Sequence, residues 1–203
     1  MAEPAPPLLG LVLAGGRSER LGTDKAAVVF GGLPMLARTV ALLGTLLPDV
    51  RVAIRPDQAG DALRRGFRLV IDGADGSGPA AGILAAHAAE PHAAWLVMAC
   101  DLPGVGEADL ARLVAARDPA RDATAFRSPR DDRPEPLCAI YEPATLARFQ
   151  RQVAGGGNTS PRGWLEAGRP VLLQAPAVDQ LDSINTREDL RRLAPSAVNH
   201  PAR

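Results

Sequence analysis

Short apolar runs alternate along the chain with stretches whose apolar residues recur at helical spacing. The first run, LLGLVL at Leu8–Leu13, stops abruptly at Ala-Gly-Gly, which is typical of a buried strand that enters a loop. Later runs have similar lengths and polar or glycine-rich boundaries. The further expected strands are Val50–Ile54, Arg68–Ile71, Ala94–Ala99, Ala123–Phe126, Leu137–Tyr141 and, at a sheet edge, Val171–Gln174.

The segments between these runs predict helices. Pro79 and Pro143 stand where a helix tolerates proline, in its first turn. The last helix has Asn185 or Thr186 as its cap. The expected helices are Met35–Leu47, Asp57–Arg65 with its polar face outward, Ala80–Ala89, Glu107–Arg117, Pro143–Val153, a short one near Gly163–Ala167, and Thr186–Leu193.

This alternation predicts an α/β fold: a single-domain, Rossmann-like open sheet, mostly parallel, with helices on both faces. Such folds bind ligands beyond the carboxyl ends of their strands. The most unusual segments, 14–25, 72–79 and 100–103, follow predicted strands directly, so we expect the site where they meet. One domain is expected over 1–194, with a disordered tail over 195–203.

Composition and charge exclude some classes of function. The 203 residues include 23 Lys+Arg and 23 Asp+Glu, so no net field attracts the chain to nucleic acid or acidic lipid. No apolar run approaches the roughly 20 residues that span a bilayer. Cys100 and Cys138 lack metal-ligand spacing and are expected to be reduced, partly buried thiols. These features predict a cytoplasmic protein that partners neither nucleic acid nor membrane.

The segment LAGGRSERLGTDK at 13–25 carries the strongest chemical signal. Its small residues allow backbone N–H groups to approach phosphate oxygens, and Arg17, Arg20 and Lys25 place cations around the same point. The segment is neither a P-loop nor a G-x-G-x-x-G motif. On composition alone, a Gly-Gly turn followed by a solvated charged loop is the alternative.

The same string resembles the nucleotide-binding signature of the MobA-like nucleotidyltransferases, in the form found in molybdenum cofactor guanylyltransferases. Ala-Gly-Gly, an Arg, a Gly and Asp-Lys match almost position for position, and Leu21 stands where Met is usual. The resemblance implies catalytic roles for Arg20 and Lys25. It also implies nucleotide binding by Leu13, Ala14, Gly15, Gly16 and Lys25.

A second stretch, GSGPAAG at 76–82, follows Asp72. Glycines at a helix start permit close approach of a base or ribose, and the free N–H groups there favour an anion. The family has an aspartate near the end of its third strand, followed by Gly-Pro-Leu-Ala-Gly. The resemblance implies that Asp72 lies near the guanine or ribose and that Gly78, Pro79 and Gly82 bind the nucleotide. A proline-started helix packed on the sheet is the alternative.

A third stretch, WLVMACDLP at 95–103, delivers one carboxylate at the end of a predicted strand. Mg²⁺ prefers oxygen ligands and usually takes few of them from protein. Asp101 matches the metal-binding aspartate of the family. The resemblance therefore implies that Asp101 holds Mg²⁺, contacts the nucleotide and takes part in catalysis.

A weaker match lies at 181–190, LDSINTREDL. It resembles a family segment near the pterin site, which implies pterin binding by Asn185 and Asp182. Asp182 stands where the family commonly has Asn, and an ordinary helix cap is the alternative. The loops Arg133–Leu137 and Gly155–Arg162 are further candidate substrate contacts, because loops at strand ends often carry function.

The resemblance covers most of the chain and implies the fold of the nucleotide-diphospho-sugar transferases and a Mg²⁺-dependent reaction. GMP would pass from GTP to molybdopterin, giving the guanine dinucleotide cofactor and pyrophosphate, with transient contacts to other molybdenum cofactor enzymes. One alternative is a sibling transferase that uses CTP with molybdopterin, or another nucleoside triphosphate with a sugar 1-phosphate. The other is a non-catalytic nucleotide-binding regulator, against which the presence of both Lys25 and Asp101 speaks.

Overall fold

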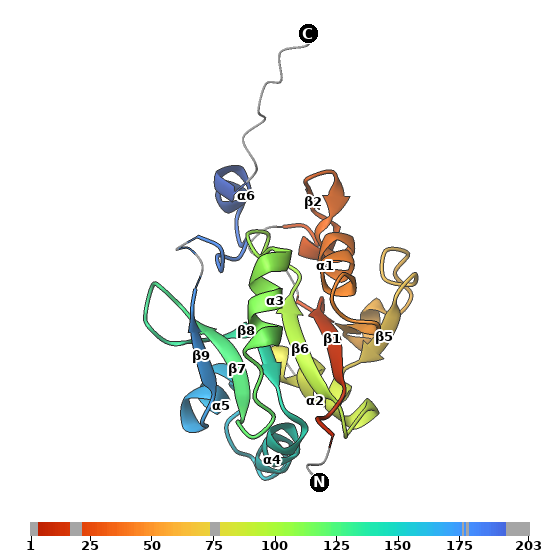
Figure 1. Cartoon of the computed structure of the whole chain (residues 1–203). Coiled ribbons are helices and arrows are strands. Elements are labelled where there is room, and N and C mark those ends of the chain that lie inside the picture. The colour runs from red at the N-terminus through yellow and green to blue at the C-terminus, as the bar shows by residue number, and fades with distance from the viewer. Residues whose placement is uncertain (1–3, 17–21, 74–77, 176, 178, 194–203) are drawn as a thin grey trace.

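A seven-stranded sheet forms the centre of the molecule (Figure 1). The computed structural model describes residues 4–16, 22–73, 78–175, 177 and 179–193; the predicted tail 195–203 lies outside them. The strands are β1 (Leu8–Leu13), β4 (Val50–Ile54), β5 (Arg68–Ile71), β6 (Ala94–Ala99), β7 (Ala123–Arg127), β8 (Pro134–Tyr141) and β9 (Val171–Gln174).

The strand order is β5-β4-β1-β6-β8-β7-β9. Parallel pairing links β5, β4, β1 and β6, and also links β7 with β9. Strand β8 pairs antiparallel with both β6 and β7, so it runs opposite to the rest of the sheet. The expected mostly parallel α/β sheet is confirmed, and β9 lies at the predicted edge.

Helices cover the sheet, and a short hairpin forms a separate two-stranded sheet. The hairpin pairs β2 (Val29–Phe30) with β3 (Leu33–Pro34), and two short 3-10 turns lie at Lys25–Ala27 and Pro56–Gln58. None of the helices in the described ranges is long and apolar enough to cross a bilayer. The helices are α1 (Met35–Gly44), α2 (Pro79–Ala89), α3 (Glu107–Ala115), α4 (Pro143–Ala154), α5 (Pro161–Ala167) and α6 (Arg187–Leu193).

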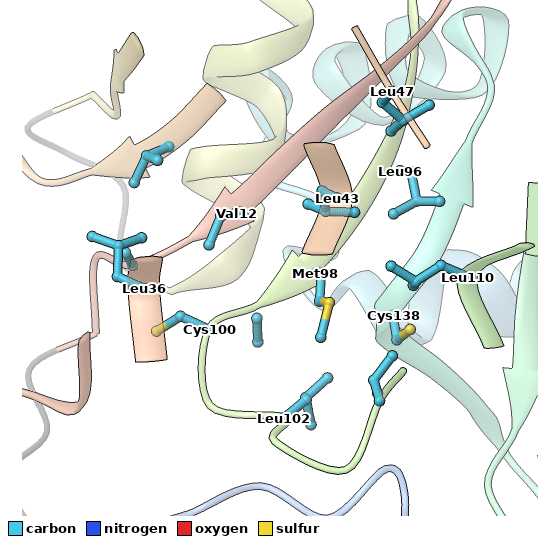
Figure 2. Close-up of a cluster of buried hydrophobic side chains, with 14 of the residues drawn as sticks. Val12, Leu36, Leu43, Leu47, Leu96, Met98, Cys100, Leu102, Leu110 and Cys138 are labelled. Atoms are coloured by element: carbon cyan, nitrogen blue, oxygen red, sulfur yellow. The ribbon is translucent and has the colours of Figure 1, made fainter. Parts of the chain in front are cut away.

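The sheet separates two apolar clusters, as strand β6 illustrates. All residues of β6 are buried. Because successive side chains of a strand point to opposite faces, Leu96 and Met98 lie in one cluster and Trp95 and Val97 in the other. The first cluster packs against α1 and α3 (Figure 2), and the second against α2, α4 and α5. Helices therefore cover both faces, as predicted.

A glycine sets the distance between α2 and the sheet. A Cβ atom on Gly82 would lie 2.9 Å from Cβ of Ala53 on β4 and 3.1 Å from Cδ2 of Leu13 on β1. These separations are shorter than normal contacts, so a larger residue would push α2 outward. Gly82 is buried in this packing contact, whereas Gly78, just before the helix, has a φ of 87° that favours glycine.

The predicted helix Asp57–Arg65 is wrong. Only the 3-10 turn Pro56–Gln58 forms there, and turns follow it. Gly60 weakens a helix at this point, and the Asp61 carboxylate accepts a hydrogen bond from the N–H of Leu63 at 3.1 Å, which competes with helical pairing. The polar residues expected to point outward do so in part only, because the side chain of Arg64 is buried.

Other boundaries differ by less. The helix expected over Met35–Leu47 ends at Gly44, and the one expected over Glu107–Arg117 ends at Ala115. Strand β8 begins at Pro134, earlier than expected. The two expected thiols, Cys100 and Cys138, are both free and buried.

Candidate active site

Three strand ends define one edge of the sheet. Strands β1, β5 and β6 run in the same direction and end at Leu13, Ile71 and Ala99. The three segments that the sequence singled out follow these ends directly. The described parts of the three segments therefore lie beyond the carboxyl ends of the strands, at the edge where the site is predicted.

An ion pair of Lys25 and Asp101 lies at this edge. Nζ of Lys25 donates to Oδ2 of Asp101 at 2.8 Å and to Oδ1 of Asn185 at 2.7 Å. The side chains of Lys25 and Asp101 are 18% and 17% exposed, so the pair is shielded but remains accessible to a ligand. The N–H of Ile184 also donates to the backbone oxygen of Asp101 at 2.9 Å. Three distant parts of the chain thus meet at one ammonium group.

The start of α6 holds Asn185. The backbone N–H groups of Asn185 and Thr186 donate to Oδ2 of Asp189 at 3.0 and 2.8 Å. In return, Oγ1 of Thr186 accepts from the N–H of Asp189 at 3.1 Å. This reciprocal capping fixes the chain just before the helix, and of the two predicted caps it is Thr186 that serves.

Lys25 is held in place by the residue before it. Asp24 accepts from the N–H of Ala26 at 3.0 Å and so caps the short 3-10 turn in which Lys25 lies. The other oxygen of Asp24 pairs with Arg64 at 2.7 Å, and Arg64 also donates to the backbone oxygen of Ala14 at 3.0 Å. One guanidinium therefore joins the two ends of the glycine-rich loop.

Arg64 remains charged although its side chain is only 1% exposed. Burial lowers the pKa of Arg64, but hydrogen bonds to Asp24 and Asp61 outweigh this effect and raise the pKa overall. The loop that it closes includes residues 17–21, which lie outside the described ranges. Arg20 is among them, and its catalytic role stays a prediction.

Two arginines orient the peptide groups of the loop. Arg64 binds the carbonyl of Ala14, and Nη1 of Arg55 donates to the carbonyl of Gly15. The C=O and N–H of a trans peptide point in opposite directions, and the described chain has no cis peptide bond. The N–H groups of Gly15 and Gly16 therefore point away from the arginines. Two donors are thus pre-oriented for an anionic ligand.

A buried carboxylate lies beside this loop. Asp72 is 8% exposed, and its Oδ2 lies 3.6 Å from the Cβ position of Gly15. Its Oδ1 is buried without a hydrogen-bond partner among the described residues. Burial raises the pKa of Asp72, while the charge of Arg55 opposes the rise and that of Asp57 adds to it. An orphaned buried acceptor is rare in proteins, so Asp72 is suited to a donor on a ligand.

The remaining predicted nucleotide residues lie around the same edge. Leu13 ends β1, and Gly78 and Pro79 begin α2. Gly82 has a packing role, because its Cα faces β1 and β4. Nucleotide contacts of these four residues stay predictions.

A polar pocket of about 400 Å³ opens at Asn185, so it adjoins the ion pair of Lys25. The two candidate substrate loops contribute Glu135 and Arg162 to it. Its walls come from the β7–β8 turn, the start of β8, α5 and the segment after β9. The lining includes Arg130, Glu135, Arg162, Asp182, Asn185 and Arg192.

Asp182 holds two arginines of this pocket. Its carboxylate accepts from Nε and Nη2 of Arg130 at 2.8 and 2.6 Å and from Nη1 of Arg192 at 2.9 Å. The hydrogen bonds from Arg130 lower the pKa of Asp182, burial opposes them, and Arg192 adds to the lowering. Asp182 is therefore ionised and occupied, and direct pterin binding by it stays a prediction.

Two oxygen atoms that could bind a cation converge at the Lys25 ammonium. Oδ2 of Asp101 and Oδ1 of Asn185 lie within hydrogen-bond distance of one positively charged atom. In the described ranges, no group of three or more His, Cys, Asp or Glu side chains could hold a metal. A carboxylate and an amide oxygen fit a hard cation that takes few ligands from protein, such as Mg²⁺.

The sequence did not single out Arg55 or Arg64, and it named Glu135 only within the candidate loop Arg133–Leu137. Arg64 fell in the predicted helix 57–65, whose polar face was expected to point outward. Arg55 and Glu135 belong to no motif that indicates their contacts. Pairs of carbonyl and guanidinium groups far apart in sequence leave no local signal, so only the fold reveals them.

Comparison with known proteins gives consistent results. The model of the MobA-like NTP transferase domain matches residues 10–197. A molybdenum cofactor guanylyltransferase from Pseudomonas paraeruginosa is 33% identical, over 92% of this chain and 94% of that protein. A molybdenum cofactor biosynthesis bifunctional protein from Synechocystis is 31% identical over 90% of this chain, which spans 52% of its length. The crystal structure of molybdopterin-guanine dinucleotide biosynthesis protein A from Archaeoglobus fulgidus has the same fold, with a TM-score of 0.70 at 24% identity, over 90% of this chain and 95% of that one.

Proposed function

The chain belongs to the MobA-like NTP transferase family, and on this basis we propose that it transfers GMP from GTP to the phosphate of molybdopterin. The products are the guanine dinucleotide form of the cofactor and pyrophosphate. The observation that carries the proposal is the meeting of Lys25, Asp101 and Asn185 beyond the carboxyl ends of β1 and β6. This chain matches proteins named molybdenum cofactor guanylyltransferase over nearly the whole of their length. Those names support the assignment of a guanine nucleotide as donor and of the pterin as acceptor.

The reaction needs positioning and neutralised charge more than proton removal, because the acceptor phosphate is already an anion. A phosphate oxygen of the acceptor attacks the α-phosphorus of GTP. The bond from that phosphorus to the bridging oxygen breaks, and pyrophosphate leaves with the electron pair. Lys25 and Arg20 offset the developing negative charge, while the N–H groups of Gly15 and Gly16 hold phosphate oxygens.

Mg²⁺ is the proposed cofactor, and Asp101 is the residue that would hold it, with the amide oxygen of Asn185 beside it. When bound, such an ion supplies positive charge that screens the nucleotide phosphates. Asp182 and Asn185 are assigned to the acceptor side, where Asp182 fixes the donors of Arg130 and Arg192 at the pocket wall. The two substrates then meet at Lys25.

Asp72 gives a prediction in which activity and stability separate. Asp72→Asn is expected to raise the KM for GTP by about 10- to 100-fold, because a charged acceptor for the nucleotide is lost. The pKa of Asp72 is raised in the folded protein above the ordinary pKa of an aspartate. Ionisation of Asp72 therefore destabilises the folded state once the pH exceeds that ordinary pKa. At neutral pH the Tm of the variant should therefore equal or exceed that of the wild type. Steady-state kinetics measure the KM for GTP and thermal unfolding measures the Tm. An unchanged KM would exclude the proposed contact between Asp72 and the nucleotide.

Arg64 gives a second prediction. Arg64→Met should lower the free energy of unfolding by about 2–3 kcal/mol, since carbonyl and carboxylate partners are left unpaired. It should also weaken nucleotide binding, because the peptide groups at Ala14 lose their orientation. The exposed neighbour supplies the control: Arg65→Met should match the wild type in urea unfolding and in the Kd for GTP. Equal GTP affinity in both variants would show that Arg64 is purely structural.

Calorimetric titration with GTP, CTP, ATP, UTP and dTTP in the presence of Mg²⁺ tests the nucleotide assignment. A preference for GTP, followed by formation of the dinucleotide and pyrophosphate when molybdopterin is added, is the expected result. A preference for CTP would instead assign the chain to a sibling transferase. Binding of a nucleotide without turnover would favour the non-catalytic regulator.

A further inference from the structure

Most carboxylates that line the pocket are already engaged by the protein. Asp182 accepts three hydrogen bonds from two arginines. Asp131 accepts from Nη1 of Arg162 at 3.1 Å, and Asp189 accepts from the N–H of Asn185 at 3.0 Å and from the following residue. These groups shape the wall, but their acceptor positions are largely used.

Glu135 differs from these carboxylates. Its Oε1 accepts from the N–H of Leu137 at 3.0 Å, but its Oε2 lies 3.6 Å from Nη2 of Arg162, beyond a normal hydrogen bond. The side chain is 13% exposed. Burial raises the pKa of Glu135, and the charges of Asp131 and Asp101 add to the rise. The hydrogen bond from Leu137 and the charge of Arg162 oppose it. An ionised carboxylate has about four acceptor positions, so Glu135 has room for N–H donors of a ligand.

The reversed direction of β8 explains why this carboxylate reaches the site. The other strands bring their last residues to the carboxyl edge, whereas β8 brings its first residues there. Cys138 pairs with Met98 near the end of β6, so the residues of β8 before Cys138, including Glu135, extend toward the edge where Asp101 lies. Asn185 lines the same pocket and binds Lys25. A ligand that contacts Glu135 with one end can therefore present its other end to the ion pair.

We propose that Glu135 recognises the pterin ring of the acceptor by accepting hydrogen bonds from its 2-amino-4-oxopyrimidine edge, an inference that rests on the proposed guanylyl transfer. That edge presents an amino N–H and a ring N–H side by side, and the two oxygens of a carboxylate accept both. Guanine has the same edge. The chain accordingly places a buried carboxylate with spare acceptor capacity beside the nucleotide loop, Asp72, and a half-buried one in the pocket, Glu135.

Glu135→Gln tests the proposal, because glutamine keeps the shape but replaces one acceptor by a donor. The KM for molybdopterin should rise by about 10- to 100-fold, while the KM for GTP stays within about twofold of the wild type. Glu166→Gln is the matched control: Glu166 lies on α5, pairs with Arg133 at 2.6 Å and does not contribute to the pocket wall. Equal KM values for molybdopterin in the two variants would overturn the proposal. A rise in the KM for GTP alone would overturn it as well.

A binding measurement separates this inference from the proposed reaction and needs no variant to begin with. Fluorescence titrations of the wild type compare pterin with lumazine, in which a carbonyl oxygen replaces the 2-amino group and would face the carboxylate. Pterin should bind at least about tenfold more tightly, and Glu135→Gln should remove that preference. A Glu135-dependent preference without dinucleotide formation would uphold the inference and refute the reaction. Wild-type protein that binds the two rings equally, or binds neither, would overturn the inference whatever its activity.

Discussion

Lys25→Met is expected to lower kcat for guanylyl transfer by about 10²- to 10³-fold, the effect of removing one pre-positioned charge from a transition state. The ammonium is the point on which Asp101 and Asn185 converge, so its removal takes the positive charge away from the centre of the site. The free energy of unfolding should change by less than about 1 kcal/mol, because the ion pair is partly exposed and methionine keeps the apolar stem. Pyrophosphate release and urea unfolding measure the two quantities.

The sequence sharpens this test, because Lys25 is its only lysine and every other basic side chain except three histidines is arginine. Lys25→Arg should also be impaired, since a planar guanidinium cannot occupy the position of a compact ammonium. An amine-specific reagent can modify only Lys25 and the terminal amine. GTP should protect Lys25 from this modification. Full activity of Lys25→Met, or modification of Lys25 that GTP does not slow, would exclude the residue from the reaction.

Asp101→Asn is expected to lower kcat/KM by about 10³-fold, equivalent to the several kcal/mol that a bound metal contributes to such reactions. The substitution keeps the shape of the side chain. It also preserves the hydrogen bond from the N–H of Ile184 to the backbone oxygen of residue 101, so the fold should persist. GTP binding should weaken by no more than about tenfold, because the glycine-rich loop supplies its own donors. Activity measured over a range of Mg²⁺ concentrations should show a higher requirement for the metal.

The control for this substitution is Asp132→Asn. Asp132 is a surface aspartate, 82% exposed and paired with Arg127. It should retain wild-type kinetics and the wild-type Mg²⁺ requirement. If Asp101→Asn behaves in the same way, Asp101 does not hold the metal, and another oxygen donor at the edge must be sought.

Long apolar runs predicted the sheet well, because burial on both faces leaves a strong signal in sequence. The strand Ala94–Ala99 is buried throughout and was placed without error. The hairpin Val29–Phe30 and Leu33–Pro34 was not predicted, because strands of two residues have no periodicity to detect. The direction of β8 was also not predictable, since an apolar strand reads alike in both directions.

The site was predictable only where motifs carry it. Lys25 and Asp101 were identified by resemblance, and the structure brings them within 2.8 Å. The contact of Lys25 with Asn185 spans 160 positions in the chain, and no local pattern encodes it. Glu135 was named only within a candidate loop, because its significance comes from what its neighbours leave unsatisfied.

The position of Ile184 and Asn185 separates the completeness of the sheet from the completeness of the reaction centre. All strands of the central sheet end by Gln174, whereas the segment that binds Asp101 and Lys25 follows them in the chain. A chain shortened to end before Ile184 would keep every strand of the sheet and lose the contacts to Asp101 and Lys25. Abundance measured by sheet content alone would then overstate the amount of working enzyme.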